Sequence, residues 1–131
     1  MRRKGFTLIE LLVIFAIIAV AAGYFSFRFS GFLDRIKLSS AARAVVADLR
    51  AGQADALSRH AEVEFRFDRR DYTRDGLTRK LPSGVEATAP SQIVFGATGL
   101  PEPGKFGTIT FSCGEGTVSI VISSSGRIRT E

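Results

Sequence analysis

The chain has 131 residues, 45% of them hydrophobic and 24% charged, which fits a single domain of ordinary size and excludes a disordered tail. Its one Cys excludes an internal disulfide, and one His with one Cys are too few for a structural zinc site, which needs four ligands. The net charge is +5, but three of those charges are Arg2, Arg3 and Lys4, so any basic function must rest on a local cluster of residues.

A short basic leader at residues 1–5 precedes a long apolar segment at residues 6–29. No charged residue occurs from Leu11 to Phe25. About 20 helical residues cross a hydrocarbon core of about 30 Å, so this segment is long enough to span a membrane. The basic residues before it predict a cytoplasmic N-terminus. A secretory signal peptide that is removed whole is the alternative, but its hydrophobic region would be only about 7–15 residues long.

Glu10 is the single carboxylate in this apolar segment. A charge at the centre of a spanning helix costs about 2.5–3.5 kcal/mol, which makes Glu10 a functional candidate. Cleavage between Gly5 and Phe6 would create a free α-amino group near Glu10, with an ordinary pKa of about 7.7–8.0. That amine could pair with Glu10 of a neighbouring chain, which predicts lateral assembly of helices in a fixed register.

The N-terminus resembles the leader and cleavage motif of type IV pilins and type II secretion pseudopilins in the run Lys4-Gly5-Phe6-Thr7-Leu8-Ile9-Glu10-Leu11-Leu12. The resemblance implies that a prepilin peptidase cleaves after Gly5, that Phe6 is N-methylated and that Glu10 serves assembly. It also implies an inner-membrane anchor whose helix later packs with other pilins or pseudopilins in a filament. Many pilins carry a Pro late in this helix, whereas no Pro precedes Pro82 here. A membrane-tethered domain that never polymerises is the competing interpretation.

The helical pattern continues beyond the apolar segment. Leu38, Val45 and Leu49 belong to an apolar series that recurs at helical spacing, with charged residues between its members. We therefore expect one long helix from about Thr7 to about Arg59, amphipathic in its second half. Small residues in the Ala-Gly-Gln step at 51–53 would let a sheet pack closely against it.

Short strands separated by turns follow this helix. Alternation is clearest at residues 61–67, where Val63, Phe65 and Phe67 share one face. Further strands are expected at 72–73, 77–81, 84–88, 92–95, 107–113, 117–123 and 127–130, with a hairpin turn at 114–116. The predicted fold is α+β: a long N-terminal helix whose amphipathic half packs on an antiparallel β-sheet in a pilin-like periplasmic domain covering residues 30–131.

This domain resembles the GspH/FimT group of minor pilins. The resemblance rests on residues 49–59 running into the strand at 63–67, on Ile93-Val94-Phe95, on the hairpin strands at 109–122 and on the closing Gly126-Arg127-Ile128. The group implies a minor subunit, present in few copies, that primes or caps a filament for type II protein secretion or pilus function.

The C-terminal residues point to a second function. They resemble the Gly-Arg-x-Arg tail of FimT members linked to DNA uptake in natural transformation. On a strand, Arg127 and Arg129 would point to one face and Ile128 to the core, which places the two guanidinium groups about 7 Å apart and suits them to grip DNA phosphates. Gly126 would keep the approach open, and Lys105 would join the arginines if its loop folds back. A solvated edge strand protected by charge is the alternative.

No catalytic residue, metal site or cofactor is expected. His60, at the helix-to-strand junction, is expected to have a capping or surface role. Cys113 falls on the apolar face of a strand and is expected to be a buried structural thiol. The acidic residues at 62–75 are interleaved with arginines such as Arg66 and Arg69, which would repel calcium. The sequence therefore predicts a non-enzymatic subunit, and it leaves secretion and DNA uptake as alternatives.

Overall fold

The computed structural model describes residues 6–131, and in these residues a single long helix precedes a series of short strands. Helix α1 runs over Leu8–Arg59. The strands are β1 (Val63–Phe67), β2 (Asp71–Arg74), β3 (Leu77–Lys80), β4 (Glu86–Thr88), β5 (Ile93–Phe95), β6 (Thr108–Cys113), β7 (Gly116–Ile122) and β8 (Ile128–Thr130). This order confirms the predicted α+β class.

The hydrophobic core lies entirely in the second of two compact units, Asp34–Glu131, and the boundary between the units follows Leu33. The core joins the apolar face of the second half of α1 to the inner faces of the strands. Its largest completely buried side chains include Phe65, Phe95 and Phe111. Phe65 and Phe95 pack edge to face, with ring centroids 6.1 Å apart.

The strands form two antiparallel sheets of four strands each. One sheet has the order β3-β2-β1-β5 and the other the order β4-β6-β7-β8. The expectation of one antiparallel sheet missed this division. Alternation along a strand reports which face is buried, but it does not report which strand pairs with which. The strands β4 and β5 have only three residues each, so they show little alternation in the sequence. Each of them also lies in a different sheet from the strand before it, since β4 pairs with β6 and β5 pairs with β1.

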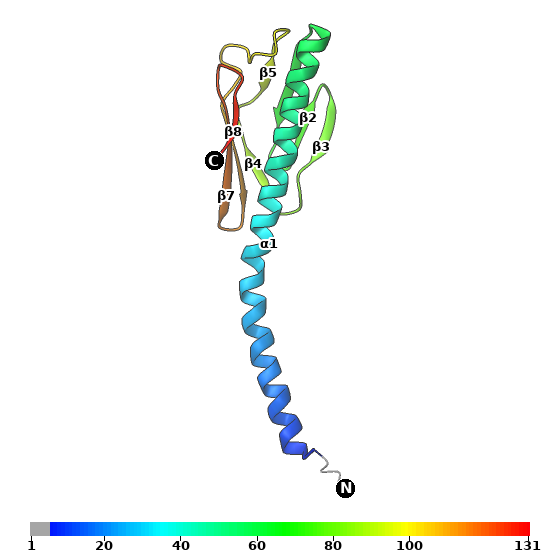
Figure 1. Ribbon diagram of the computed structural model, residues 1–131, viewed down its shortest axis with the longest axis vertical. Helices are drawn as coiled ribbons and strands as arrows, with labels where there is room; N and C mark the ends of the chain where they lie inside the picture. The colour runs from blue at the N-terminus through cyan, green and yellow to red at the C-terminus, as the bar shows by residue number, and fades with distance from the viewer. Residues whose placement is uncertain (1–5) are drawn as a thin grey trace. The chain divides into compact units, whose positions relative to one another are not determined.

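The second half of α1 packs against both sheets, with β2 and β3 to one side and β7 and β8 to the other (Figure 1). A Cβ built on Gly52 would lie 2.5 Å from the Phe65 ring, so the helix backbone touches β1 directly. On the other side, a Cβ on Gly116 would lie 2.8 Å from Leu38 Cδ1. The expectation that small residues near position 52 permit close packing is confirmed.

The end of α1 has a specific local cause. His60 adopts a left-handed backbone conformation with φ of 50°. The N–H of Ala61 donates to the carbonyl of Ala56 at 3.3 Å, which is the hydrogen bond of a Schellman motif with His60 in the position usually taken by Gly. The capping role expected for His60 is thus a backbone role.

Candidate functional site

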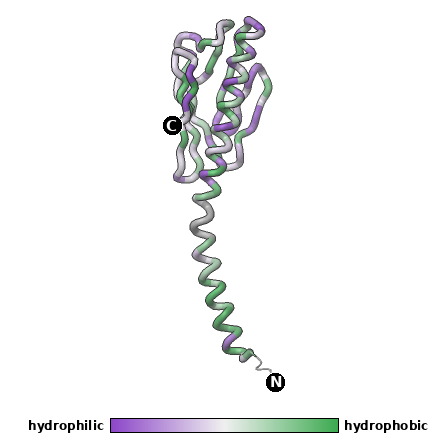
Figure 2. Tube along the Cα trace, in the orientation of Figure 1, coloured by the Kyte–Doolittle hydropathy of each residue, from purple (hydrophilic) through white to green (hydrophobic). Residues whose placement is uncertain are grey.

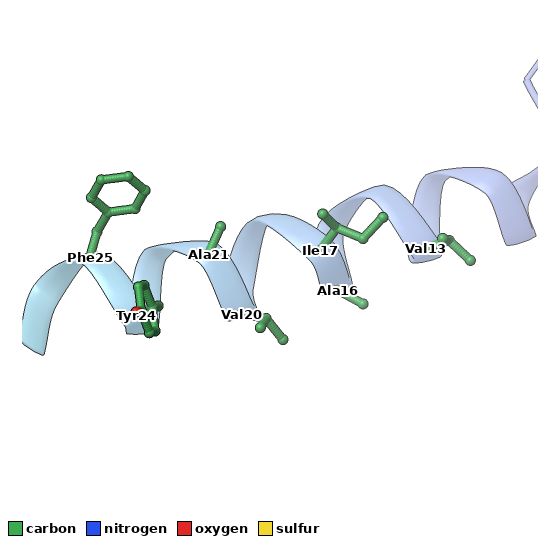
Figure 3. A pocket seen from close by; sticks show the side chains of 7 residues that line it. All are labelled: Val13, Ala16, Ile17, Val20, Ala21, Tyr24 and Phe25. Carbon is green, nitrogen blue, oxygen red and sulfur yellow. The ribbon is translucent and has the colours of Figure 1, made fainter.

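The first half of α1 presents an apolar surface. The stretch Leu8–Phe25 has a mean hydropathy of 2.5, and none of it is buried inside the structure. Figure 2 shows this part of the helix as almost uniformly hydrophobic. Side chains three to four positions apart line a shallow apolar depression on it, as Figure 3 shows for Val13, Ala16, Ile17, Val20, Ala21, Tyr24 and Phe25. Among the described residues, this helix alone is long and apolar enough to cross a membrane.

Glu10 lies in the first turn of α1 and is exposed. Its backbone N–H donates to Oγ1 of Thr7 at 3.3 Å, and the N–H of Leu11 donates to the Thr7 carbonyl at 3.2 Å. Thr7 is therefore the N-cap residue, and Thr7-Leu8-Ile9-Glu10 has the spacing of a capping box. The sequence analysis missed this local role, although the Thr-x-x-Glu pattern signals it. The positive end of the helix dipole also favours a carboxylate here.

Of the two residues at the expected cleavage site, the structure describes only Phe6. Gly5, the expected cleavage residue, lies outside the described residues. Phe6, the expected methylation site, precedes the helix, and 70% of it is exposed.

Arg127 and Arg129 are both exposed, and they lie on the same outer face of the sheet formed by β7 and β8. A shallow depression there is lined by Val121, Ser123, Ser125, Arg127, Arg129 and Glu131. Ile128 points the other way and packs against the core. Within residues 6–131, neither arginine forms a salt bridge. The two guanidinium groups are thus available to an anion.

The structure explains why residue 126 is Gly, and the reason is not the expected one of keeping the approach to the arginines open. Gly126 is buried, with φ of 77°, and a Cβ there would lie 2.8 Å from Nε2 of Gln53. That Nε2 donates to the carbonyls of Gly99, at 2.8 Å, and of Gly126, at 3.3 Å. The Gln53 side chain therefore connects the β5–β6 loop to the β7–β8 turn. This contact fixes the position of the turn that immediately precedes Arg127.

The structure does not bring Lys105 to the arginines. Its ammonium pairs with Oε2 of Glu102 at 2.9 Å. The pKa of Lys105 is raised by the hydrogen bond to Glu102, and also by the charges of Glu62 and Glu64. Lys105 therefore faces acidic residues of the β1 side of the domain.

Two charged contacts that the sequence analysis missed hold α1 to β2 and β3. Asp48 accepts a hydrogen bond from the hydroxyl of Tyr72 and pairs with Nη1 of Arg79 at 3.0 Å. About two turns further along the same face of α1, Asp55 pairs with Arg74. One partner of each pair is largely buried, since the Asp48 side chain is only 13% exposed and that of Arg74 only 17%, whereas Arg79 and Asp55 are 56% and 35% exposed. Burial and the hydrogen bond to Asp48 raise the pKa of Tyr72.

Cys113 is buried at the end of β6, as expected. Its thiol donates to Oδ1 of Asp34 at 3.3 Å. Burial is the main cause that raises the pKa of Cys113, and the hydrogen bond to Asp34 is the next. The acidic residues near β1 and β2 take part in pairs such as Arg66–Glu64 and backbone contacts. In the part of the chain that the structure describes, no three His, Cys, Asp or Glu side chains are grouped as a metal site.

Comparison with known proteins gives two findings. The model of the prokaryotic N-terminal methylation motif matches residues 1–24. The crystal structure of the type IV minor pilin FimU of Pseudomonas aeruginosa (strain PAO1) matches with a TM-score of 0.63 and 20% sequence identity, over 76% of this chain and 92% of that chain. No curated protein gives a significant sequence match.

These findings show that the N-terminus carries the prokaryotic N-terminal methylation motif and that the fold of the chain is pilin-like. The motif belongs to the region that carries Gly5, Phe6 and Glu10, and the structural likeness to FimU covers the fold. At this level of identity, the likeness to FimU bears on the fold alone.

Proposed function

We propose that the chain is a minor pilin or pseudopilin subunit of the GspH/FimT group. In this proposal, prepilin peptidase removes residues 1–5 and Phe6 becomes N-methylated. The helix over residues 6–29 anchors the chain in the inner membrane, with residues 30–131 in the periplasm. The processed subunit then joins other pilins or pseudopilins and primes or caps a filament for type II secretion or pilus function.

One combination of features supports the proposal: the methylation motif over residues 1–24 opens an exposed apolar helix that leads into a pilin-like fold. A helix with none of its apolar stretch buried needs lipid or other helices around it. A membrane supplies the first environment and a filament core the second.

Processing is tested with Gly5→Val. The variant should remain an uncut precursor in the membrane, while the wild-type chain starts at N-methylated Phe6, as read by mass spectrometry of the N-terminal peptide. Gly23→Val is the matched control, because a Cβ at Gly23 meets nothing within 4 Å and cleavage should proceed normally. An intact Met1 end on the wild-type chain, in cells with a working peptidase, would overturn the proposal.

Two substitutions at Glu10 separate charge pairing from helix capping. Gln fits the capping-box position as Glu does but carries no charge, whereas Leu removes both roles. If the carboxylate pairs with the amine of a neighbouring Phe6, both variants should insert in the membrane and both should crosslink poorly to other pilin-like subunits. Normal incorporation of Glu10→Gln would exclude the charge pairing.

DNA binding is the second candidate function, and the exposed Arg127 and Arg129 on one face favour it. Two guanidinium groups make weak and strongly salt-sensitive phosphate contacts. The full chain in uncharged detergent should bind a DNA oligonucleotide at about 50 mM salt, and Arg127→Gln with Arg129→Gln should abolish binding. The control removes the same charge elsewhere, through Arg69→Gln with Arg70→Gln. Absence of binding by the wild-type chain would exclude this function.

The kind of filament is a separate question. Deletion of the gene should abolish protein export if the chain serves type II secretion. It should instead abolish twitching or natural transformation if the chain serves a pilus or DNA uptake.

A further inference from the structure

Strand β8 forms one edge of its sheet, and the register of the ladder defines which backbone groups lie on the open side. Glu131 exchanges two hydrogen bonds with Ser119, at 2.8 and 2.9 Å, and the Arg127 carbonyl accepts from the Ser123 N–H at 3.0 Å. Such pairs alternate along an antiparallel ladder. The N–H and carbonyl groups of the intervening residues therefore point away from β7, and those residues are Ile128 and Thr130. No strand of the described chain pairs with β8 on that side.

A shallow depression lies between α1 and the end of strand β8. Its walls are Ser39, Ala42 and Arg43 of α1, Val118 of β7, and Thr130 and Glu131 at the end of β8. Most of these side chains are small. The inner face of an added strand would therefore find room for small or β-branched side chains next to Thr130.

The outer face of the same edge is basic. Arg127 and Arg129 project there without an acidic ion-pair partner among residues 6–131, and Glu131 follows them at the end of the strand. Cross-strand neighbours directly opposite one another lie about 4.5–5.5 Å apart, so unlike charges at these positions attract.

We propose that the open edge of β8 binds an extended acidic peptide segment by antiparallel strand addition. The register specifies the partner's pattern. Acidic residues lie opposite Arg127 and Arg129, small or β-branched apolar residues lie opposite Ile128 and Thr130, and a basic residue lies opposite Glu131. Read from the N-terminus of the partner, the pattern is Lys-Val-Glu-Val-Glu. Main-chain hydrogen bonds supply affinity, and the alternating side chains supply specificity.

The probe is the pentapeptide Lys-Val-Glu-Val-Glu with blocked ends, titrated into the full-length chain in uncharged detergent micelles. Amide hydrogen exchange, followed by NMR, should slow at Ile128 and Thr130, whose N–H groups point outward. It should change little at Arg129, whose N–H already faces β7. The charge-swapped peptide Glu-Val-Lys-Val-Lys should not bind.

A pair of variants tests the backbone contact. Thr130→Pro removes the outward N–H, and an edge position tolerates Pro because the pairing with β7 does not use that group. Thr130→Val keeps the N–H and has nearly the same shape. Affinity for the peptide should fall about fivefold in Thr130→Pro, the effect of one hydrogen bond of about 1 kcal/mol, and should persist in Thr130→Val.

Three results would overturn the proposal. Equal binding of the charge-swapped peptide would remove the role of the arginines. Equal binding by Thr130→Pro, or binding without slower exchange at Ile128 and Thr130, would remove strand addition. A DNA oligonucleotide that binds this edge while the peptide does not would assign the arginines to phosphate.

Discussion

Gly52→Ala sets helix propensity against packing at one position. Gly in a helix interior costs about 1 kcal/mol relative to Ala, so propensity alone predicts a gain in stability. In the structure, however, a Cβ at this position would lie 2.5 Å from Cε2 and 2.6 Å from Cζ of Phe65, and 3.3 Å from Cγ1 of Val63. Carbon atoms pack best at about 3.5–4.0 Å, so the ring must move by about 1 Å.

The ring has little room to move. Phe65 is completely buried and packs edge to face on Phe95. Overpacking of this kind costs about 1–3 kcal/mol, occasionally more, against a gain of about 1 kcal/mol in helix propensity. Gly52→Ala should therefore lower the free energy of unfolding, by about 1 kcal/mol at the middle of that range.

The measurement is chemical denaturation of a segment spanning residues 34–131, which contains the whole core. Phe65→Leu relieves the overlap, so the double variant should be less destabilised than the sum of the two single variants, with a coupling of about 1 kcal/mol. Ala51→Gly at the neighbouring exposed position calibrates helix propensity and should cost about 1 kcal/mol. A Gly52→Ala variant that is more stable than the wild type would refute the packing argument.

Three further predictions concern local contacts. Tyr72 is the single Tyr of residues 34–131, and its pKa is raised in the folded chain. Its contribution to the free energy of unfolding is therefore complete at pH values below the ordinary tyrosine pKa of about 10. That contribution declines as the pH rises above about 10. Ultraviolet titration should show that Tyr72 ionises at a higher pH than an ordinary tyrosine does. The Asp48→Asn variant should lower the pH of this ionisation. His60→Gly should raise the free energy of unfolding by about 0.5 kcal/mol, because it relieves the left-handed backbone at some cost in chain entropy; a loss of stability would contradict this. Cys113 should react with iodoacetamide at pH 8 far more slowly in the native chain than in denaturant, because it is buried and burial also raises its pKa. Equal rates would contradict its burial.

The elements with a strong repeating pattern could be predicted from the sequence. Helix α1 was expected over about 7–59, and it runs over Leu8–Arg59, because apolar residues and helical periodicity persist through it. Strands β1 and β6 show alternating burial that matches their alternating residues. Strand β3 was also expected, at 77–81, although it is exposed along its whole length and shows no alternating burial. It is held by pairing with β2 alone in its sheet.

Candidate sites can be proposed from the sequence where a motif is contiguous in the chain. The leader and the arginine pair are short runs of residues, and a strand puts alternate side chains on one face. Contacts between distant residues were not predictable. The Asp48–Tyr72 contact, the Gln53 hydrogen bonds and the position of Lys105 each depend on how the two sheets meet the helix, which no local pattern encodes.

The order in which the strands enter the two sheets makes it difficult for one part of the domain to unfold without the rest. The chain leaves the first sheet after β3, contributes β4 to the second, returns for β5 and leaves again for β6. Each sheet is thus completed only by a strand that lies beyond a segment of the other. Neither sheet corresponds to a contiguous piece of sequence that could melt or be clipped away on its own. The domain should lose its structure in one cooperative transition, and a protease should find either the intact domain or the fully opened chain.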